Sequence, residues 1–252
     1  MNKTNMKRIL KTLALSAAAA LSLVSCRLDD YDGTALLYPN AIVTVKTADD
    51  GTCYLQLTDD TALKPVNLKS SPYKKEMRAL VNITEEGDCP DARFDKQVKV
   101  NSIDSVRTKD VVPTLGEPED AEVYGDVPIE VVGYWVTGLE DGYLTLSFCA
   151  YWGDPSKKHS IDLVAGTDPE DPGLYVLRHN AREDVGSANS YRMTGIIAFN
   201  LRDASGEWPR TLTLRYKAFN GAMRTLLFSA DRYGAELPET ERLSAVRALP
   251  VE

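Results

Sequence analysis

Apolar residues after residue 40 recur at every second position, in short runs that turn-forming residues separate. Residues 41–46 and 52–58 form two such runs on either side of Ala48-Asp-Asp-Gly51, and an Asp-Gly pair strongly favours a hairpin turn. The same alternation returns in residues 77–83 and 98–103. About five short strands in this length are typical of a small barrel, which we place at residues 37–112.

The region after residue 120 contains a second series of predicted strands. They are residues 127–137, 143–151, 160–164, 174–178, 193–201, 211–218 and 223–229. About seven short strands at this spacing predict an antiparallel β-sandwich over residues 121–232, so the whole chain is expected to be all-β. Helical periodicity is confined to residues 240–248, in a C-terminal tail of residues 233–252.

Residues 113–120 carry two prolines, a glycine and three acids without periodicity, and we interpret them as a linker. The charge differs on its two sides, because residues 37–112 are close to neutral whereas the part after residue 112 is strongly acidic. The chain as a whole has a net charge of −8. Such a chain is repelled by nucleic acid, so we expect no nucleic-acid partner.

Residues 1–25 have the three parts of a secretory signal peptide. A basic start is followed by an apolar run at residues 13–23 and by the small residue Ser25. The apolar run is too short to span a bilayer as a helix of the mature protein. We therefore predict an exported chain whose fold begins after residue 25.

Cys26 directly follows this signal. Leu23-Val24-Ser25-Cys26 resembles the lipobox of bacterial lipoproteins, in which signal peptidase II cuts before the cysteine and the thiol carries a diacylglycerol. Each buried CH₂ contributes about 0.8 kcal/mol, so two or three acyl chains of the palmitate type anchor a protein stably. The alternative is a cysteine that ends the signal peptide by chance. We predict that Cys26 is the lipid attachment point and that the protein binds the outer membrane through it.

Residues 26–36 form an acidic tether, in which Asp29, Asp30 and Asp32 lie close together. They resemble the acidic export signal that directs lipoproteins of some gut and oral anaerobes to the cell surface. A solvated, flexible tether has the same composition, so an anchor that faces the periplasm is the alternative.

Four stretches carry a further resemblance. They are Tyr151-Trp-Gly-Asp154, His159-Ser-Ile-Asp-Leu-Val164, Leu177-Arg-His-Asn180 and Ile197-Ala-Phe-Asn-Leu201. Together with the lipobox, they resemble the NigD-like lipoproteins. The resemblance implies an N-terminal OB-like barrel followed by a C-terminal β-sandwich, and the family takes its name from a gene associated with the bacteriocin nigrescin. It supplies no catalytic or binding residues.

The two histidines of the chain, His159 and His179, are the first candidates for chemistry. With Asp162, Glu183 or Asp184 they would supply metal ligands, but structural zinc sites need four ligands and catalytic ones three. Both histidines lie at predicted strand ends, where a hydrogen-bonded structural role is ordinary. The chain also lacks a Gly-x-Ser-x-Gly nucleophile motif. We therefore expect neither metal, cofactor nor enzyme activity.

Three cysteines remain once Cys26 is assigned to the lipid. Cys53 and Cys89 lie in the same predicted domain, and a disulfide between them would contribute about 3–4 kcal/mol in the chain-entropy model. Cys53 also suits the core as an apolar residue, so both interpretations stay open. Cys149 lies inside a predicted strand and is expected to be buried.

Trp135, Trp152 and Trp208 are candidate ligand-facing aromatics, because flat rings at the rim of a sandwich can stack on sugars. The alternative is that they pack in the strands as core residues. The favoured function is a non-enzymatic, lipid-anchored surface protein with a binding or protective role, linked to a bacteriocin through the family name. A surface glycan-binding module that serves polysaccharide uptake is the alternative. The partners expected are the membrane, through the lipid, and an unidentified protein or glycan.

Overall fold

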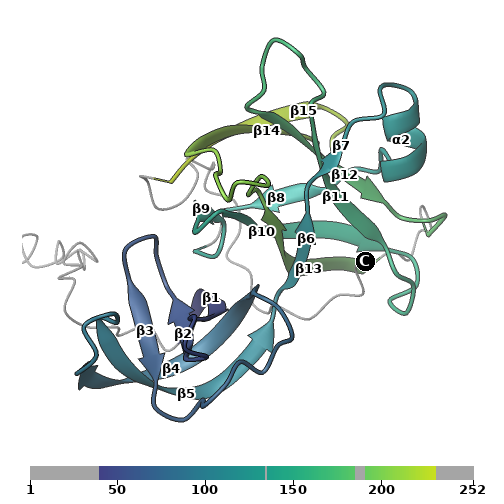
Figure 1. Cartoon of the computed structure of the whole chain (residues 1–252). Helices are drawn as coiled ribbons and strands as arrows, with labels where there is room; N and C mark the ends of the chain where they lie inside the picture. Colours follow the sequence, from purple (N-terminus) through teal and green to yellow (C-terminus); the bar gives the residue numbers. More distant parts are fainter. Residues whose placement is uncertain (1–39, 134, 185–190, 231–252) are drawn as a thin grey trace, which may run out of the picture. The chain divides into compact units, whose positions relative to one another are not determined.

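The first five strands close into a barrel with the spatial order β1-β2-β3-β5-β4 (Figure 1). The computed structural model describes residues 40–133, 135–184 and 191–230. The barrel strands are β1 (Asn40–Thr47), β2 (Cys53–Gln56), β3 (Ala62–Pro65), β4 (Met77–Asp88) and β5 (Lys96–Ser105). This order, with β3 and β5 parallel, confirms the predicted barrel.

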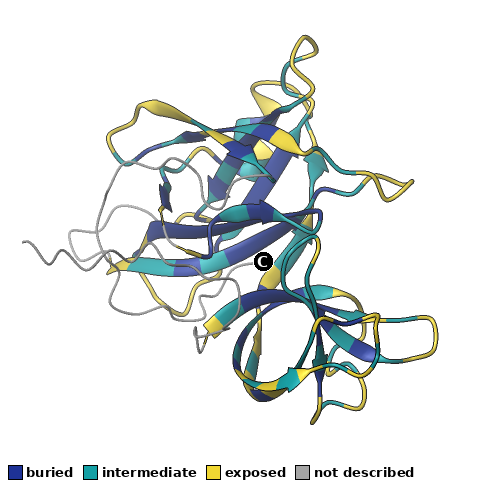
Figure 2. Ribbon diagram, turned by 90° about the vertical axis from the view of Figure 1, so that its left-hand side faces the viewer, coloured by how far each residue is buried: buried dark blue, intermediate teal, exposed yellow. Residues whose placement is uncertain are grey.

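The apolar residues at alternate positions of these strands fill the interior of the barrel. Val43 and Val45 of β1, Leu55 of β2, Leu63 of β3 and Val98 of β5 are all completely or almost completely buried. Figure 2 draws buried segments of the chain in dark blue. The long strand β4 pairs with both β1 and β5, and its register with β5 shifts at two places. Such irregularities bend a strand, which is what a strand needs to close a small barrel.

Two sheets form the sandwich. One has the order β6-β13-β10-β8 with β9 beside β10, and the other has the order β15-β14-β12-β11-β7. Their elements are β6 (Arg107–Asp110), β7 (Val112–Pro113), α2 (Glu119–Tyr124), β8 (Glu130–Val132), β9 (Gly138–Glu140), β10 (Tyr143–Trp152), β11 (Ser160–Ala165), β12 (Leu174–Asn180), β13 (Tyr191–Asn200), β14 (Thr211–Lys217) and β15 (Met223–Ser229). Strands β10 to β15 confirm six of the seven predicted strands.

The strand predicted at residues 127–137 is confirmed only at β8, and its other described residues are not in a strand. A turn follows β8, and it is closed by the Thr137 hydroxyl, which donates a hydrogen bond to the Val132 carbonyl oxygen at 2.9 Å. The same hydroxyl oxygen accepts a hydrogen bond from the backbone N–H of Ser147 at 2.9 Å. A side chain therefore replaces the strand ladder at this point, which the apolar pattern did not reveal.

Strands β6 and β7 were not predicted. They pair in parallel with β13 and β11, so each extends one sandwich sheet, and β7 ends at Pro113, the first residue of the segment that we interpreted as a linker. That segment contains the start of the six-residue helix α2. The described part of the chain contains no helix long and apolar enough to cross a membrane.

The sandwich core lies between the inner faces of its two sheets. Leu144, Leu146 and Phe148 of β10 are completely buried there, together with Leu214 of β14 and Phe199 of β13. The other face of β10 is also buried, which explains why this strand shows little polar alternation. A smaller apolar cluster joins barrel residues, Ile42 among them, to the sandwich.

Ion pairs also connect the barrel with the sandwich. The guanidinium of Arg78, which is almost completely buried, contacts Glu140 at 3.4 Å and donates a hydrogen bond to the Thr44 hydroxyl at 3.0 Å. Lys46 pairs with Asp141 at 2.7 Å. The barrel and the sandwich therefore share buried apolar contacts and partly buried ion pairs.

The Cys53–Cys89 disulfide considered above is not formed, because both residues are free thiols. Cys53 is buried on β2, whereas Cys89 directly follows β4. In the closed barrel β2 and β4 are not neighbours, because β1 separates them on one side and β3 and β5 on the other, and neighbouring strands are about 4.8 Å apart. A disulfide needs Cα atoms within about 7 Å, so this order keeps the two cysteines apart. Cys149 is buried in β10, as predicted.

Candidate functional site on the barrel

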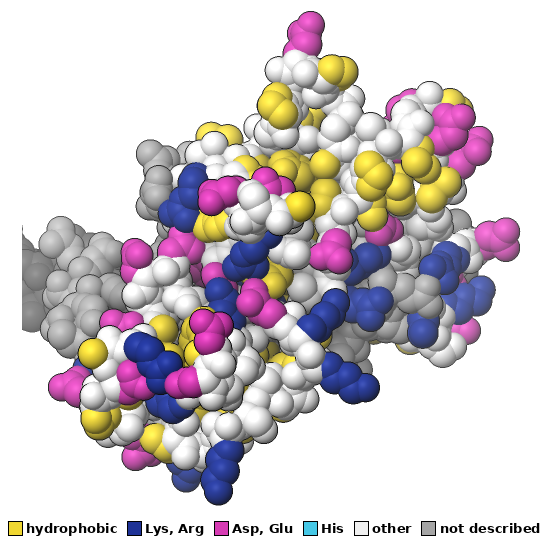
Figure 3. Space-filling model, in the orientation of Figure 1, with side chains coloured by type: hydrophobic (Ala, Val, Ile, Leu, Met, Phe, Trp, Pro, Cys, Tyr) yellow, Lys and Arg dark blue, Asp and Glu magenta, His cyan; other side chains and the backbone are white. Residues whose placement is uncertain are grey.

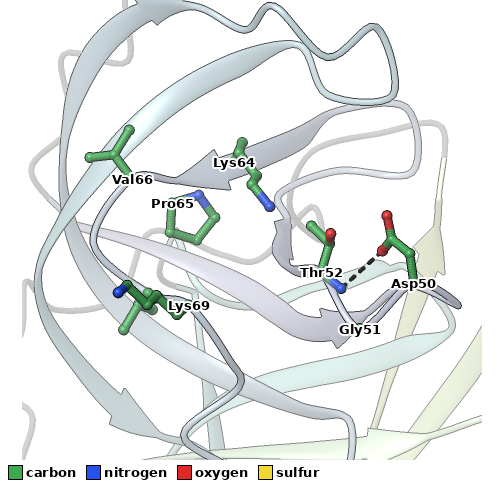
Figure 4. Close-up of a pocket in the computed structure, with 8 residues that line it drawn as sticks. Asp50, Gly51, Thr52, Lys64, Pro65, Val66 and Lys69 are labelled. Carbon is green, nitrogen blue, oxygen red and sulfur yellow. Dashed lines mark hydrogen bonds between the residues drawn. The ribbon is translucent and has the colours of Figure 1, made fainter.

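A hollow of about 390 Å³ lies on the barrel between the β1–β2 turn and the end of β3 (Figure 4). This volume is in the range of small-molecule sites. Eight residues line it: Asp50, Gly51, Thr52, Lys64, Pro65, Val66, Leu68 and Lys69. OB-type barrels bind oligonucleotides and oligosaccharides on the face of their second and third strands, beside the loop that joins the first two. The hollow lies at this loop and along β3.

The β1–β2 turn is shaped by local hydrogen bonds. The backbone N–H of Gly51 donates to the Ala48 carbonyl oxygen at 2.8 Å, and the Asp50 carboxylate accepts the backbone N–H of Thr52 at 2.9 Å. Gly51 has a φ of +83°, in the left-handed region that favours glycine. The Asp-Asp-Gly sequence therefore encodes the wall of the hollow directly.

Arg93 ties this turn to the segment between β4 and β5. Its guanidinium contacts Asp50 at 2.9 Å and Asp91 at 2.7 Å. The pKa of Asp50 falls to about 2, first because of the Thr52 backbone N–H, then the Thr52 hydroxyl, and then Arg93. Asp50 thus stays ionised at neutral pH, with much of its charge compensated by Arg93.

Lys64 and Lys69 supply the free positive charge of the hollow. Neither lysine makes an ion pair with a described residue, and the Lys64 ammonium lies 5.3 Å from the centre of the Phe94 ring. An ammonium group is a point charge with three donors, which suits phosphate and other anionic oxygens. The arrangement can therefore hold an anionic group next to the hydroxyl of Thr52.

Lys74 and Lys75 follow on the segment between β3 and β4, and they also make no ion pair with a described residue. With Lys64 and Lys69 they give residues 62–75 four cations and no acid. Arg78, which is close to these lysines in sequence, lies elsewhere: it is buried against Glu140 and Thr44. The surface cluster of positive charge therefore excludes Arg78.

His159 and His179 form a buried hydrogen-bonded chain in the sandwich. His159 Nδ1 lies 2.9 Å from His179 Nε2, and His159 Nε2 lies 3.1 Å from the Asp184 carboxylate. The Trp152 ring stacks on His159 with the ring centres 4.2 Å apart. Asp184 also accepts the backbone N–H groups of Gly153 and Asp154. The chain joins the start of β11, the end of β12 and the turns beside them.

Burial controls the protonation of these two histidines. It lowers the pKa of His159, although the Asp184 carboxylate opposes the shift. The pKa of His179 falls to about 4, through burial first and the neighbouring His159 second. Burial alone would raise the pKa of Asp184, but hydrogen bonds from Asp154, His159 and Gly153 outweigh it, and the pKa is lowered. The histidines are therefore neutral at pH 7.

The other candidate metal ligands do not join the histidines. Asp162 pairs with Lys109 at 2.5 Å, and Glu183 is in a turn with a φ of +68°. Among the described residues, no group of three or more His, Cys, Asp or Glu side chains has an arrangement suited to a metal ion. The two histidines and Asp184 instead stabilise one end of the sandwich, the structural role that their position at strand ends predicted.

The three tryptophans differ in exposure. Trp152 is completely buried, so its prediction as a ligand-facing residue is wrong. It occupies an even-numbered position of β10, as the core residues Leu144 and Phe148 do. Residues two apart on a strand share a face, so this shared parity was the signal in the sequence that indicated a core position. Trp208 is half-buried against the core beneath Arg210, whereas Trp135 is 49% exposed.

The predicted lipid site lies outside the described residues. This holds for Cys26, for the lipobox residues Leu23, Val24 and Ser25, and for the acidic residues Asp29, Asp30 and Asp32. The assignments for these residues remain predictions from the sequence.

Comparison with known families identifies both domains. Residues 42–106 match the NigD-like N-terminal OB domain, and residues 110–230 match the NigD-like C-terminal beta sandwich domain. The chain belongs to the NigD-like family. The family match confirms the resemblance, and it also places the NigD-like barrel and sandwich where the strands place them.

Several solved structures are similar to this NigD-like chain. A protein of Parabacteroides distasonis, named as toxin-related, is 30% identical over 76% of this chain and 93% of its own, with a TM-score of 0.57. A Bacteroides vulgatus protein of unknown function is 19% identical over 75% and 89% of the two chains, with a TM-score of 0.60. A Bacteroides fragilis protein, named as a lipoprotein, is 15% identical over 76% and 97%, with a TM-score of 0.50. The last two share the fold. A search of the curated proteins finds no match.

Proposed function

We propose that this NigD-like protein is a lipoprotein of the outer membrane, anchored through Cys26, and that it acts by binding rather than by catalysis. The observation that carries the binding role is the barrel hollow, where Lys64 and Lys69 face a space of about 390 Å³ without acidic partners among the described residues. The lipobox supports the anchor.

The ligand that best fits the hollow is an anionic saccharide of the cell envelope or its surroundings. The two ammonium groups suit a phosphate or carboxylate, and Thr52 offers a hydroxyl for sugar hydroxyl groups. Nucleic acid is disfavoured, because the sandwich is strongly acidic and the whole chain has a net charge of −8.

A binding experiment tests this role. An array of anionic glycans and their neutral counterparts is probed with the full chain and with the double variant Lys64→Gln/Lys69→Gln. We expect the variant to bind about tenfold more weakly to the anionic glycans, because two charge-assisted contacts are lost. Lys99→Gln is the matched control, since Lys99 is exposed on β5 and makes no ion pair with a described residue. Equal binding of anionic and neutral glycans, or of parent and double variant, would contradict the proposed ligand.

The anchor has a separate test. Cys26→Ser should abolish labelling with radioactive palmitate and release the protein from the membrane fraction. Replacement of Asp29, Asp30 and Asp32 by alanine should leave labelling intact but remove accessibility to protease added to whole cells. If this triple variant is digested as fast as the parent, the acids are only a tether.

A role with a toxin is the second candidate, and one observation favours it. The relative that is 30% identical over three quarters of this chain is named as toxin-related. The test is deletion of the gene followed by challenge with the bacteriocins of neighbouring strains. A change in sensitivity that is restored by the parent gene supports this role, and unchanged sensitivity counts against it.

A further inference from the structure

A second hollow, of about 410 Å³, lies on the outer face of the sheet β15-β14-β12-β11-β7. Leu174 and Val176 of β12 form its floor, and they alternate with Leu177, which belongs to the sandwich core. Arg215 lies beside Val176 on β14, and Met223 of β15 also lines the hollow. The sheet therefore carries apolar side chains on both faces, and on the outer face Leu174 and Val176 are 2% and 6% exposed.

The segment between β7 and α2 builds the opposite wall. Thr114, Gly116 and Glu117 line the hollow from this side, and Asp120 fixes the segment. The buried Asp120 carboxylate accepts the Thr114 hydroxyl at 2.5 Å and the Leu115 backbone N–H at 2.7 Å. This wall is held in place by hydrogen bonds within the protein, so the hollow is preformed.

Several apolar side chains of the elements that build the hollow are exposed, and one of them, Met223, lines it. Leu115 is 52% exposed, Val123 55%, Met223 54% and Leu227 69%. In Figure 3, hydrophobic side chains gather over the region where Figure 1 draws β14, β12 and α2. An apolar patch with a polar rim is typical of a binding surface for another molecule.

Apart from Asp120, whose carboxylate is held by hydrogen bonds alone, the charges around the hollow are compensated, with two exceptions. Arg178 contacts Glu117 and Asp126, and Lys217 pairs with Asp126 at 2.5 Å. Arg215, by contrast, makes no ion pair or side-chain hydrogen bond with a described residue.

Asp168 is the second exception. Its carboxylate accepts only a backbone N–H, that of Glu170 at 3.0 Å, and it pairs with no described cation. Besides the hydrogen-bonded Asp120, the hollow thus offers one cation and one anion without a described ion pair, beside an apolar floor.

We propose that this hollow binds the C-terminal residue of a peptide with an apolar side chain. The terminal carboxylate pairs with the Arg215 guanidinium, whose paired N–H groups match its two oxygens. The apolar side chain covers Leu174, Val176 and Met223, and the Asp168 carboxylate accepts the peptide N–H. Capture of a terminal carboxylate is a recurrent mode of peptide recognition.

Titration with a pair of tripeptides tests the proposal. One is N-acetyl-Ala-Ala-Leu with a free carboxylate, and the other is the same peptide with a C-terminal amide. Backbone NMR shifts of the full chain should locate the acid peptide at β12, β14 and β15, with a dissociation constant of about 1 mM, as expected for a ligand of this size. The amide should bind about tenfold more weakly, because the contact between charged groups is lost.

Variants separate this site from general surface binding. Arg215→Gln should weaken binding of the acid peptide about tenfold and leave the urea midpoint unchanged, because Arg215 is exposed. Arg107→Gln is the matched control, since Arg107 is exposed on β6 of the other sheet and makes no ion pair with a described residue.

Two results would overturn the proposal: equal shifts with acid and amide, or no shift at β12, β14 and β15 at about ten times the expected dissociation constant. Neither result bears on the barrel hollow, which the glycan experiment tests independently.

Discussion

Acid should destabilise the sandwich through His179 at pH values where most carboxylates of the unfolded chain are still ionised. His179 is buried and neutral, with Nε2 2.9 Å from His159 Nδ1. Its pKa falls from 6.5 to about 4 in the folded protein, so between these values the unfolded chain binds more protons than the folded one. The stabilisation is complete above pH 6.5 and is lost as the pH falls toward 4.

The size of this effect follows from the shift. Each pKa unit corresponds to about 1.4 kcal/mol, so His179 alone should lower the free energy of unfolding by about 3 kcal/mol from pH 6.5 to pH 4. The pKa of His159 is lowered as well, which acts in the same direction. Asp50 and Asp184, whose pKa values are lowered from 3.8, lose their stabilising contribution mostly below this window.

Urea denaturation at pH 7.5, 6.5, 5.5 and 4.5 measures the effect, with the fluorescence of Trp152 as a reporter, because it is buried and stacked on His159. His179→Gln removes the titrating group but keeps a side-chain N–H that can donate to His159. The variant should lose most of the dependence on pH between 6.5 and 4.5, whatever its stability at pH 7.5.

The chain has only two histidines, so their NMR titration curves can be assigned with this one variant. A free energy of unfolding that stays constant within about 0.5 kcal/mol between pH 6.5 and 4.5 would refute the reasoning. So would a measured His179 pKa near 6.5.

Three further predictions concern stability, each measured by urea denaturation at pH 7.5. Arg78→Ala should lower the free energy of unfolding by about 3 kcal/mol, because it removes a buried side chain and leaves the buried Thr44 hydroxyl without its guanidinium donor; a loss below about 1 kcal/mol would show that water replaces that donor. Gly125→Ala should lower the free energy of unfolding far more than Gly51→Ala. Both glycines have positive φ, but a Cβ at Gly125 would meet the His179 carbonyl oxygen at 2.4 Å, whereas Gly51 faces open space. Equal losses in the two variants would contradict this reasoning. Trp152→Ala should lower the free energy of unfolding by about 3–5 kcal/mol and Trp135→Ala by about 0.5 kcal/mol or less, since the Trp152 ring is buried and Trp135 is exposed.

Much of the fold is local in origin and could be predicted from the sequence. The period of two in Leu212, Leu214 and Tyr216 identified β14, and the Asp-Asp-Gly turn identified the β1–β2 hairpin. Strand β6 gave no such signal, because Arg107-Thr-Lys-Asp110 is a polar edge strand that is held by parallel pairing with β13. Pairing with a strand some ninety residues away leaves no mark on a local pattern.

The candidate sites depend more on long-range contacts. Lys64 and Lys69 could be noticed as cations, but barrel closure decides that they face Asp50 and Thr52 across a hollow. Lys69, Lys74 and Lys75 precede Arg78 in the sequence, yet the Arg78 guanidinium is buried beside Glu140, away from them.

By itself, the sequence determined the all-β class and most strands, because they depend on a period of two, and it predicts the export signal and the lipobox at Cys26 from neighbouring residues. The tertiary structure alone decided that His159, His179 and Asp184 meet, that Cys53 and Cys89 do not, and that Arg215 faces the apolar floor of β12. The physical reason is that strand order and register set these distances. They arise from the burial of whole faces, and no single segment of the chain encodes them.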